Sequence, residues 1–215
     1  MTFHSALRRM FPVASLLAAA TTCATLTAAT LAAGPPAQSA PLAMDTARVT
    51  IAGTSNVHNY TAWTDTVRVT RVKLAAAIAP DTFWDDVVKP GALEGFDVAI
   101  PAATLTSTKA GLDKNMWKAL KVDAYRDITF RLVRFDRAPT GAPIAVGVLR
   151  VAGVEREVAL TLKTERRDVS LVVKGELSLL MTDYGIAPPV AMLGMLKTDP
   201  KITVSFETVL SVPRT

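Results

Sequence analysis

The chain has 215 residues, of which 50% are hydrophobic and 20% are charged, a composition that gives one domain with a full core and excludes disorder throughout. One cysteine excludes a disulfide scaffold, and two histidines disfavour a multi-histidine metal site, so we expect no metal and no cofactor. The net charge of +5 includes Arg8 and Arg9, and acidic residues are mixed among the other basic ones, so we expect no nucleic-acid partner.

The N-terminal segment has the organisation of a secretory signal peptide. Arg8 and Arg9 form a short basic start, an uncharged stretch runs from Phe11 to Gly34, and small residues close it. We therefore predict a signal peptide over 1–33, with cleavage within 29–40.

A flexible, proline-containing leader is predicted over 34–45, followed by a mature domain over 46–215 that is periplasmic or secreted. An uncleaved inner-membrane signal anchor is the alternative, because the uncharged stretch is long enough to span a bilayer. If cleavage falls after Cys23, the mature chain has no cysteine, which suits an oxidising compartment. We expect no stable membrane span in the mature form.

Beyond the leader, apolar and polar residues alternate with a period of two, as at Phe96, Val98 and Ile100. Successive strand side chains point to opposite faces, so this pattern predicts antiparallel strands with one sheltered face. The eight predicted strands span residues 46–54, 62–76, 93–101, 127–135, 143–151, 156–164, 169–180 and 201–210. In the strands 62–76 and 169–180 the apolar phase changes, which predicts bulges or strong coiling.

One short helix interrupts the strands. Leu112, Met116 and Leu120 form a one-sided apolar stripe, with Ser107 or Thr108 as the candidate N-cap, and we expect this helix to plug or flank the sheet. Eight antiparallel strands have exposed edges unless the sheet closes, so we predict an all-β, eight-stranded antiparallel barrel. A barrel of this size has a lumen that side chains fill or that holds one small ligand.

His58 is the only histidine beyond the signal segment, so a hydrolase would have to use it. There is no Gly-x-Ser-x-Gly nucleophile elbow, and no phosphate-binding or dinucleotide-binding loop. We therefore predict no catalytic residues and a protein that is not an enzyme. An esterase-type hydrolase that uses His58 remains the less favoured alternative.

Several segments together resemble the YceI-like family, in order from about Val49 to Leu210. The segments and the family elements that they resemble are Asp97–Ser107 (V-x-V-P-V-x-S-L), Gly111–Lys121 (the helix that follows), Ile128–Phe130 (P-x-I-x-F), Gly147–Val154 (G-x-L-x-I-x-G-V), Met181–Ile186 (M-T-D-F-G-I) and Val204–Phe206 (the closing strand). The resemblance implies a lipocalin-like, extended barrel that is exported to the periplasm. It also implies that a long isoprenoid or fatty-acyl chain binds in the lumen.

From these patterns we expect a binding protein that holds an apolar lipid: a polyisoprenoid, an isoprenoid quinone or a fatty-acyl chain. A ligand-free structural or stress-response protein is the alternative, and a homodimer is left open. The lumen candidates are the alternating apolar residues Phe96, Val98, Ile100, Phe130, Leu132, Val146, Val148, Leu160, Leu162, Leu171, Val173, Val204 and Phe206. The candidates for the mouth are His58, Tyr184 and Met192, the last from an apolar loop over 188–194 that we expect to cover one end.

Overall fold

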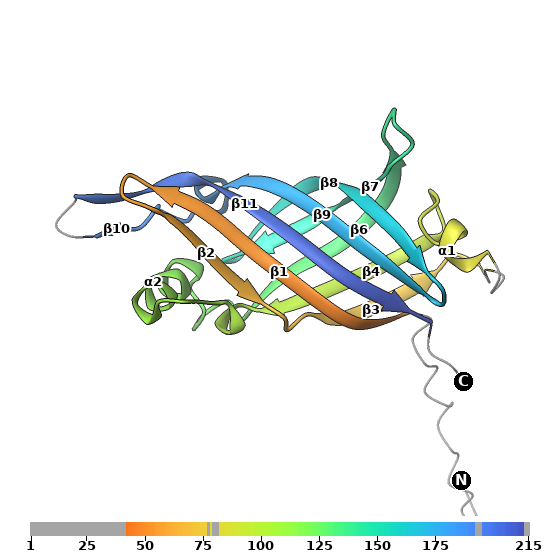
Figure 1. Ribbon diagram of the computed structural model, residues 1–215, viewed down its shortest axis with the longest axis horizontal. Coiled ribbons are helices and arrows are strands. Elements are labelled where there is room, and N and C mark those ends of the chain that lie inside the picture. Colours follow the sequence, from red (N-terminus) through yellow and green to blue (C-terminus); the bar gives the residue numbers. More distant parts are fainter. Residues whose placement is uncertain (1–41, 77, 79–81, 192–194, 213–215) are drawn as a thin grey trace, which may run out of the picture. The chain divides into compact units, whose positions relative to one another are not determined.

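The computed structural model describes residues 42–76, 78, 82–191 and 195–212. These residues form one antiparallel sheet that curls around an apolar interior (Figure 1). The strands follow the order β3-β4-β6-β7-β8-β9-β11-β1-β2-β5, and β10 pairs with β11. The predicted all-β class and the curled antiparallel sheet are confirmed, whereas the predicted signal peptide lies outside the described residues.

The strands are β1 (Ala43–Ser55), β2 (Asn59–Thr64), β3 (Arg68–Leu74), β4 (Leu93–Pro101), β5 (Thr106–Ser107), β6 (Asp127–Arg137), β7 (Pro143–Val151), β8 (Val154–Arg167), β9 (Ser170–Leu180), β10 (Val190–Ala191) and β11 (Leu196–Ser211). The helices are α1 (Phe83–Asp86) and α2 (Ala110–Leu120), with 3₁₀ turns η1 (Ala102–Thr104) and η2 (Met181–Tyr184). The first strand begins at Ala43, within the segment that was predicted to be leader. Helix α1 was not predicted.

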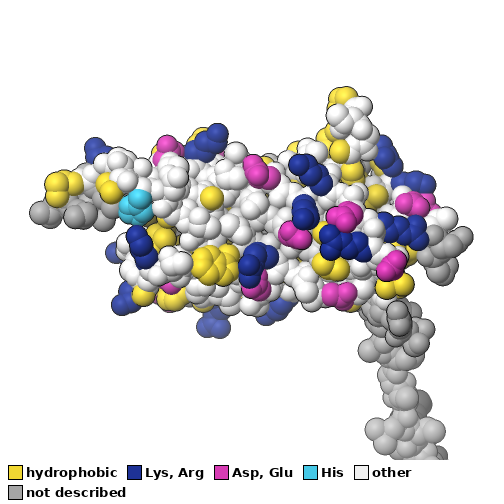
Figure 2. Space-filling model, viewed as in Figure 1, with side chains coloured by type: hydrophobic (Ala, Val, Ile, Leu, Met, Phe, Trp, Pro, Cys, Tyr) yellow, Lys and Arg dark blue, Asp and Glu magenta, His cyan; other side chains and the backbone are white. Residues whose placement is uncertain are grey.

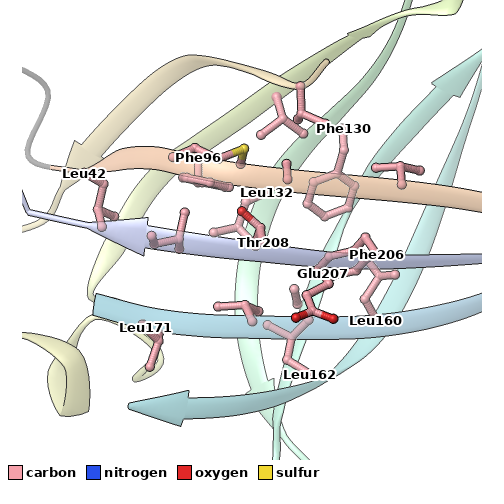
Figure 3. A pocket seen from close by; sticks show the side chains of 18 of the residues that line it. Leu42, Phe96, Phe130, Leu132, Leu160, Leu162, Leu171, Phe206, Glu207 and Thr208 are labelled. Carbon is pink, nitrogen blue, oxygen red and sulfur yellow. The ribbon is translucent and has the colours of Figure 1, made fainter. Parts of the chain in front are cut away.

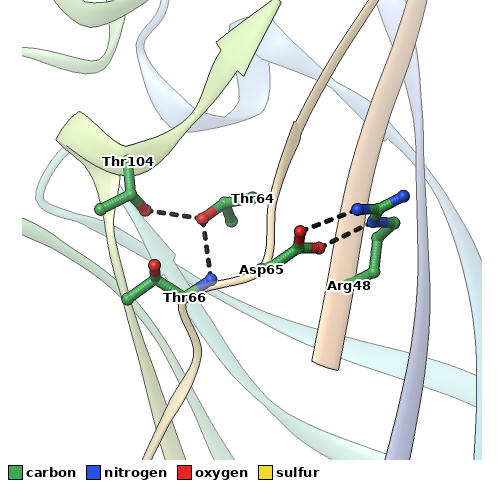
Figure 4. Close-up of polar contacts among 5 residues, drawn as sticks. All are labelled: Arg48, Thr64, Asp65, Thr66 and Thr104. Atoms are coloured by element: carbon green, nitrogen blue, oxygen red, sulfur yellow. Dashed lines mark hydrogen bonds and ion pairs between the residues drawn. The ribbon is translucent and has the colours of Figure 1, made fainter. Parts of the chain in front are cut away.

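The predicted strand 62–76 is two strands, which raises the count above eight. The chain turns at Thr64–Thr66, where the Thr64 hydroxyl accepts a hydrogen bond from the Thr66 amide at 3.1 Å and pairs with the Thr104 hydroxyl at 2.7 Å (Figure 4). Such local bonds replace strand-ladder bonds and end β2. Strand β2 pairs with β1, whereas β3 pairs with β4 at the opposite end of the strand order. This short corner therefore connects the two edges of the curled sheet.

An exposed salt bridge supports the same corner. The Arg48 guanidinium, on β1, donates two hydrogen bonds of 2.7 Å to the Asp65 carboxylate (Figure 4). Among the described residues no ladder joins β3 to β5 or β2, so the curled sheet does not close by continuous strand pairing.

Bulges set which side chains face inward. A register shift between Leu132 and Arg134 in β6 keeps Leu132 and Phe135 buried and leaves Val133 50% exposed between them. A second shift, between Val69 and Arg71 in β3, accounts for the phase change predicted there. The long strand β9 shows no register shift against β11 or β8, so a bulge within 169–180, one of the two predicted explanations, is wrong.

Two clusters of buried residues occupy the two ends of the interior. One contains Phe83 and Trp84 of α1, together with inward residues of the sheet such as Leu162. The other contains Leu120 of α2 and Leu105, with Tyr184 of η2. Figure 1 shows α1 and α2 at opposite ends of the curled sheet. The outer face in Figure 2 carries basic and acidic side chains mixed together.

Candidate binding cavity

The smaller of two apolar chambers lies at the α1 end and has a volume of about 200 Å³. Its walls come from inward side chains of β1, β4, β6, β7, β8, β9 and β11. Figure 3 shows Phe96, Phe130 and Phe206 pointing into the shared interior. Alternation along each strand brings these rings together, because residues i and i+2 share one face of a sheet.

The few polar residues at this chamber are engaged elsewhere. Arg48 pairs with Asp65, Glu207 pairs with Lys174 at 3.0 Å, and the Thr208 hydroxyl donates a hydrogen bond to the Thr46 carbonyl at 2.9 Å. The chamber therefore offers apolar contact and no available charge to a guest.

Helix α1 plugs the end of this chamber. Phe83 and Trp84 are each 6% exposed and pack edge to face, with ring centroids 5.1 Å apart. Val87, directly after the helix, lines the chamber. An apolar plug of this kind keeps water out of the α1 end, so that end favours a hydrocarbon tail.

The larger chamber lies at the α2 end and has a volume of about 610 Å³. The underside of α2 contributes Leu112, Met116 and Leu120, and β1, β2 and η2 contribute much of the remaining wall. Its volume is within the range of about 300–1,000 Å³ that is typical of small-molecule sites. The two chambers share the lining residues Val49, Ile100, Leu149 and Val204, so they adjoin along the interior of the sheet.

Helix α2 is held over its chamber by two polar contacts at η1 and β5. The Trp117 indole Nε1 donates a hydrogen bond of 2.8 Å to the Leu105 carbonyl. The buried Asp113 carboxylate accepts hydrogen bonds from the Ser107 amide at 2.7 Å and from its hydroxyl at 2.6 Å. The N-cap is Lys109, so the predicted caps Ser107 and Thr108 are wrong, although Ser107 still fixes the start of the helix through Asp113.

Most of the predicted lumen residues line one or both chambers. They are Phe96, Val98, Ile100, Phe130, Leu132, Leu160, Leu162, Leu171, Val173, Val204 and Phe206. Their contact with a ligand stays a prediction, since the structure contains none.

Val146 and Val148 do not line the lumen, and their predicted placement is wrong. Their ladder partners in β8 are Ala159 and Glu157, whereas the intervening Gly147 pairs with the inward Leu132. A Cβ atom on Gly147 would lie 2.4 Å from the Phe130 ring, so this one inward position of β7 requires glycine, whereas Leu149, two residues further along, lines both chambers. Val146 and Val148 therefore lie on the opposite face of β7, where Val146 is still buried, with 4% of its surface exposed.

Of the predicted mouth residues, His58 and Tyr184 line the larger chamber, and Met192 lies outside the described residues. His58 is exposed at the β1–β2 turn. The Ser55 hydroxyl donates a hydrogen bond to the His58 carbonyl at 2.8 Å and accepts one from its amide at 3.1 Å. These bonds use the backbone of His58 and fix the turn; they do not pair the serine with the imidazole ring.

Tyr184 differs from the other polar groups of the larger chamber. Its side chain is 3% exposed, and its hydroxyl has no hydrogen-bond partner among the described residues. Burial raises the pKa of this phenol above its usual value, so the hydroxyl stays protonated and available as a donor.

Several lining residues were missed by sequence reasoning. Leu149 lies in the predicted strand 143–151, but the alternation that assigned Val146 and Val148 to the lumen assigned Leu149 to the outer face. Trp63 lies just before the corner at Thr64–Thr66, which was not predicted. The apolar stripe of Leu112 and Met116 could have indicated these two as lining residues, since it predicted a helix packed against the sheet.

Within the described ranges, no helix is long and apolar enough to cross a membrane, and no cluster of three metal-binding side chains occurs.

The fold and the sequence define the class of this protein. The family model of the YceI-like domain matches residues 42–210. The chain therefore belongs to the YceI-like family. No curated protein matches it in sequence.

Solved structures share its fold at low sequence identity. A polyisoprenoid-binding domain from Saccharophagus degradans is 13% identical, with a TM-score of 0.59 over 81% of this chain and 100% of that one. BcnA from Burkholderia cenocepacia is 11% identical, with a TM-score of 0.58 over 76% of this chain and 95% of that one. A mutant of the Campylobacter jejuni YceI protein is 14% identical, with a TM-score of 0.50 over 70% of this chain and 85% of that one.

Proposed function

We propose that this protein binds one long apolar lipid in its two adjoining chambers and acts as a carrier or sequestering protein rather than an enzyme. The observation that carries the proposal is the apolar wall that the two chambers share, since Ile100, Leu149 and Val204 line both of them. A polyisoprenoid, an isoprenoid quinone and a fatty-acyl chain all match this shape, because each is a long chain with little polar chemistry.

The strength of such binding follows from apolar burial. Each buried methylene contributes about 0.8 kcal/mol, so ten of them contribute on the order of 8 kcal/mol. Immobilising the ligand offsets a sizeable part of this gain. Micromolar or tighter affinity is therefore expected without a charged anchor, in agreement with a smaller chamber whose charged residues Arg48 and Glu207 are paired with Asp65 and Lys174.

The relatives support the same ligand class. The Saccharophagus degradans protein that shares this fold is described as a polyisoprenoid-binding domain. That description, together with membership of the YceI-like family and the apolar interior, favours lipid binding over the hydrolase alternative. The backbone-bound Ser55 beside His58 gives a serine mechanism no further support.

We further propose that the mature protein works in the periplasm or outside the cell. The basic start and uncharged stretch of the first 33 residues support a secretory signal, and retention as an inner-membrane anchor is the alternative. Fractionation of cells that express the full chain, with the N-terminal sequence of the purified protein, distinguishes a cleaved periplasmic protein from an anchored one.

Native mass spectrometry of the protein purified without detergent tests the lipid-binding proposal. We expect bound apolar species whose masses match molecules recovered by organic extraction of the same sample. A protein that carries no extractable lipid, and that also fails to take up added long-chain lipids after delipidation, would instead support the ligand-free structural role.

A further inference from the structure

The curled sheet opens between β8 and β9 at the α2 end. The pairing of these strands runs from Arg167 with Ser170 to Leu162 with Gly175, whereas β9 stays paired with β11 as far as Leu180. A third pocket of about 370 Å³ lies where the two strands part. Its lining combines charged side chains with apolar ones such as Leu179, whereas the two chambers inside the sheet are mainly apolar.

Tyr184 lies at the boundary between this side pocket and the larger chamber, because its side chain lines both. The turn η2 places it there, packed with Leu105 and Met181 in the apolar cluster at this end. Its ring is held by that packing, yet its hydroxyl has no partner among the described residues. Burying a hydroxyl without a hydrogen bond costs free energy, so an acceptor at this boundary would be bound favourably.

The charges around Tyr184 indicate which acceptor fits. In the side pocket Arg156 and Lys201 are balanced by Glu157 and Asp183. In the larger chamber Lys109 carries the only fixed charge among the described lining residues, and its side chain is exposed. An anionic end group would therefore lack the cations that burial of a charge requires, whereas a neutral oxygen needs only a donor.

We propose that the Tyr184 hydroxyl donates a hydrogen bond to a neutral acceptor oxygen, such as a quinone or ester carbonyl, on the end group of the bound lipid. This inference rests on the proposed function and narrows it: the lipid has an oxygen-bearing end at the α2 side and a hydrocarbon tail toward α1. Tyr184 is a specificity-determining residue in this account, because a pure hydrocarbon leaves its hydroxyl unpaired.

The test compares two probes on the delipidated full chain, 2-decyl-1,4-benzoquinone and decylbenzene, which share a decyl chain on a flat six-membered ring, while only the quinone carries carbonyl oxygens. The variant Tyr184→Phe removes only the hydroxyl, and phenylalanine is the residue at this place in the family element that Met181–Ile186 resemble. The matched control is Tyr125→Phe, whose ring packs on the β7–β8 turn at Gly153, away from the chambers.

We expect Tyr184→Phe to weaken binding of the quinone about five- to tenfold and to leave binding of decylbenzene within about twofold. The quinone carbonyl band should move to lower frequency in the infrared spectrum of the wild-type complex and not in that of the variant. Thermal unfolding of Tyr184→Phe should occur at the wild-type temperature or above, because the variant buries no unpaired hydroxyl.

Equal quinone affinity and an unshifted carbonyl band in both proteins would overturn the inference while leaving the carrier function intact. An equal loss of both probes in Tyr184→Phe would assign the residue to packing alone and would also overturn it. Failure of the wild-type protein to bind either probe would overturn both the inference and the proposed function.

Discussion

The two ends of the interior differ in how they are closed. At the α1 end, two buried aromatic residues belong to the core cluster around a chamber of about 200 Å³, whose polar residues are engaged in other contacts. At the α2 end, a chamber of about 610 Å³ is covered by a helix that two polar contacts hold, and its lining includes Tyr184, whose hydroxyl has no hydrogen-bond partner in the described part of the chain. One end is thus built for exclusion of water and the other for access and recognition.

Under the proposed function, this difference gives the lipid a direction in the interior. An apolar tail gains most where water is excluded, and a polar end group gains most where a donor is available. The two closures should therefore respond differently to substitution: damage to the α1 plug should cost stability, whereas damage to the α2 cover should change access to the chamber.

The largest expected effect follows from removing the plug with Trp84→Ala. Truncation of a buried aromatic residue should lower the free energy of unfolding by about 3–5 kcal/mol, since it leaves a cavity in the cluster around α1. Urea unfolding measures this loss. The control Asp85→Ala changes an exposed residue of the same helix and should stay close to wild type. A Trp84→Ala protein as stable as its control would show that α1 is not part of the core.

Filling the interior should abolish binding without unfolding the sheet. Leu132→Trp places a large ring in the smaller chamber, and we expect at least about a tenfold loss of affinity for a long apolar probe with a stability cost of about 1–3 kcal/mol. Val148→Trp is the matched control, because it introduces the same ring on the outer face of β7. Probe titration monitored by mass spectrometry compares them. Similar affinities in the two folded variants would place the ligand outside this chamber.

Loosening the α2 cover should have a smaller and more local effect. Trp117→Phe removes the indole donor from the Leu105 carbonyl, at a cost of about 1 kcal/mol. We expect faster hydrogen exchange of the α2 amides and faster ligand dissociation, with little change in the exchange of β9 or β11. Lys118→Ala, an exposed change on the same helix, is the control. Uniform acceleration across the sheet would mean that α2 is part of one cooperative unit with the barrel.

The smallest effect is expected at the corner between β2 and β3, which belongs to neither chamber. The hydrogen bond from Arg48 lowers the pKa of Asp65 below its usual value, so the pair stabilises the fold above the ordinary aspartate range. That contribution is lost as the pH falls through the lowered pKa. Both groups are exposed, so the loss should be slight. Melting temperatures measured from pH 6 downward should converge for wild type and Asp65→Asn at acid pH, and a constant difference would contradict this role.

The strands were largely predictable, because their sheltered faces follow a period of two. The predicted strands 93–101 and 143–151 have the bounds of β4 and β7. The corner after Thr64 was not predictable in the same way, since the apolar alternation continues across it and no glycine or proline marks it. Helix α1, with four residues, is too short to show a helical period.

The lining of the cavity was less predictable than the fold. Which face of β7 points inward depends on the Phe130 ring across the ladder, which fills the space above Gly147. The same relation holds where the Phe206 ring lies 2.5 Å from the place of a Cβ atom on Gly175. Which glycine lies opposite which aromatic ring is fixed by the register between neighbouring strands. The hydrophobicity pattern along one strand contains no information about that register.

A crystal of the full chain soaked with 1-bromohexadecane tests the central claim most directly, since anomalous scattering locates the bromine atom without interpretation of weak lipid density. The account predicts an anomalous peak inside the curled sheet, enclosed by residues such as Phe96, Leu149 and Met116. A solid interior with side chains filling both chambers, or bromine found only on the outer surface, would contradict it.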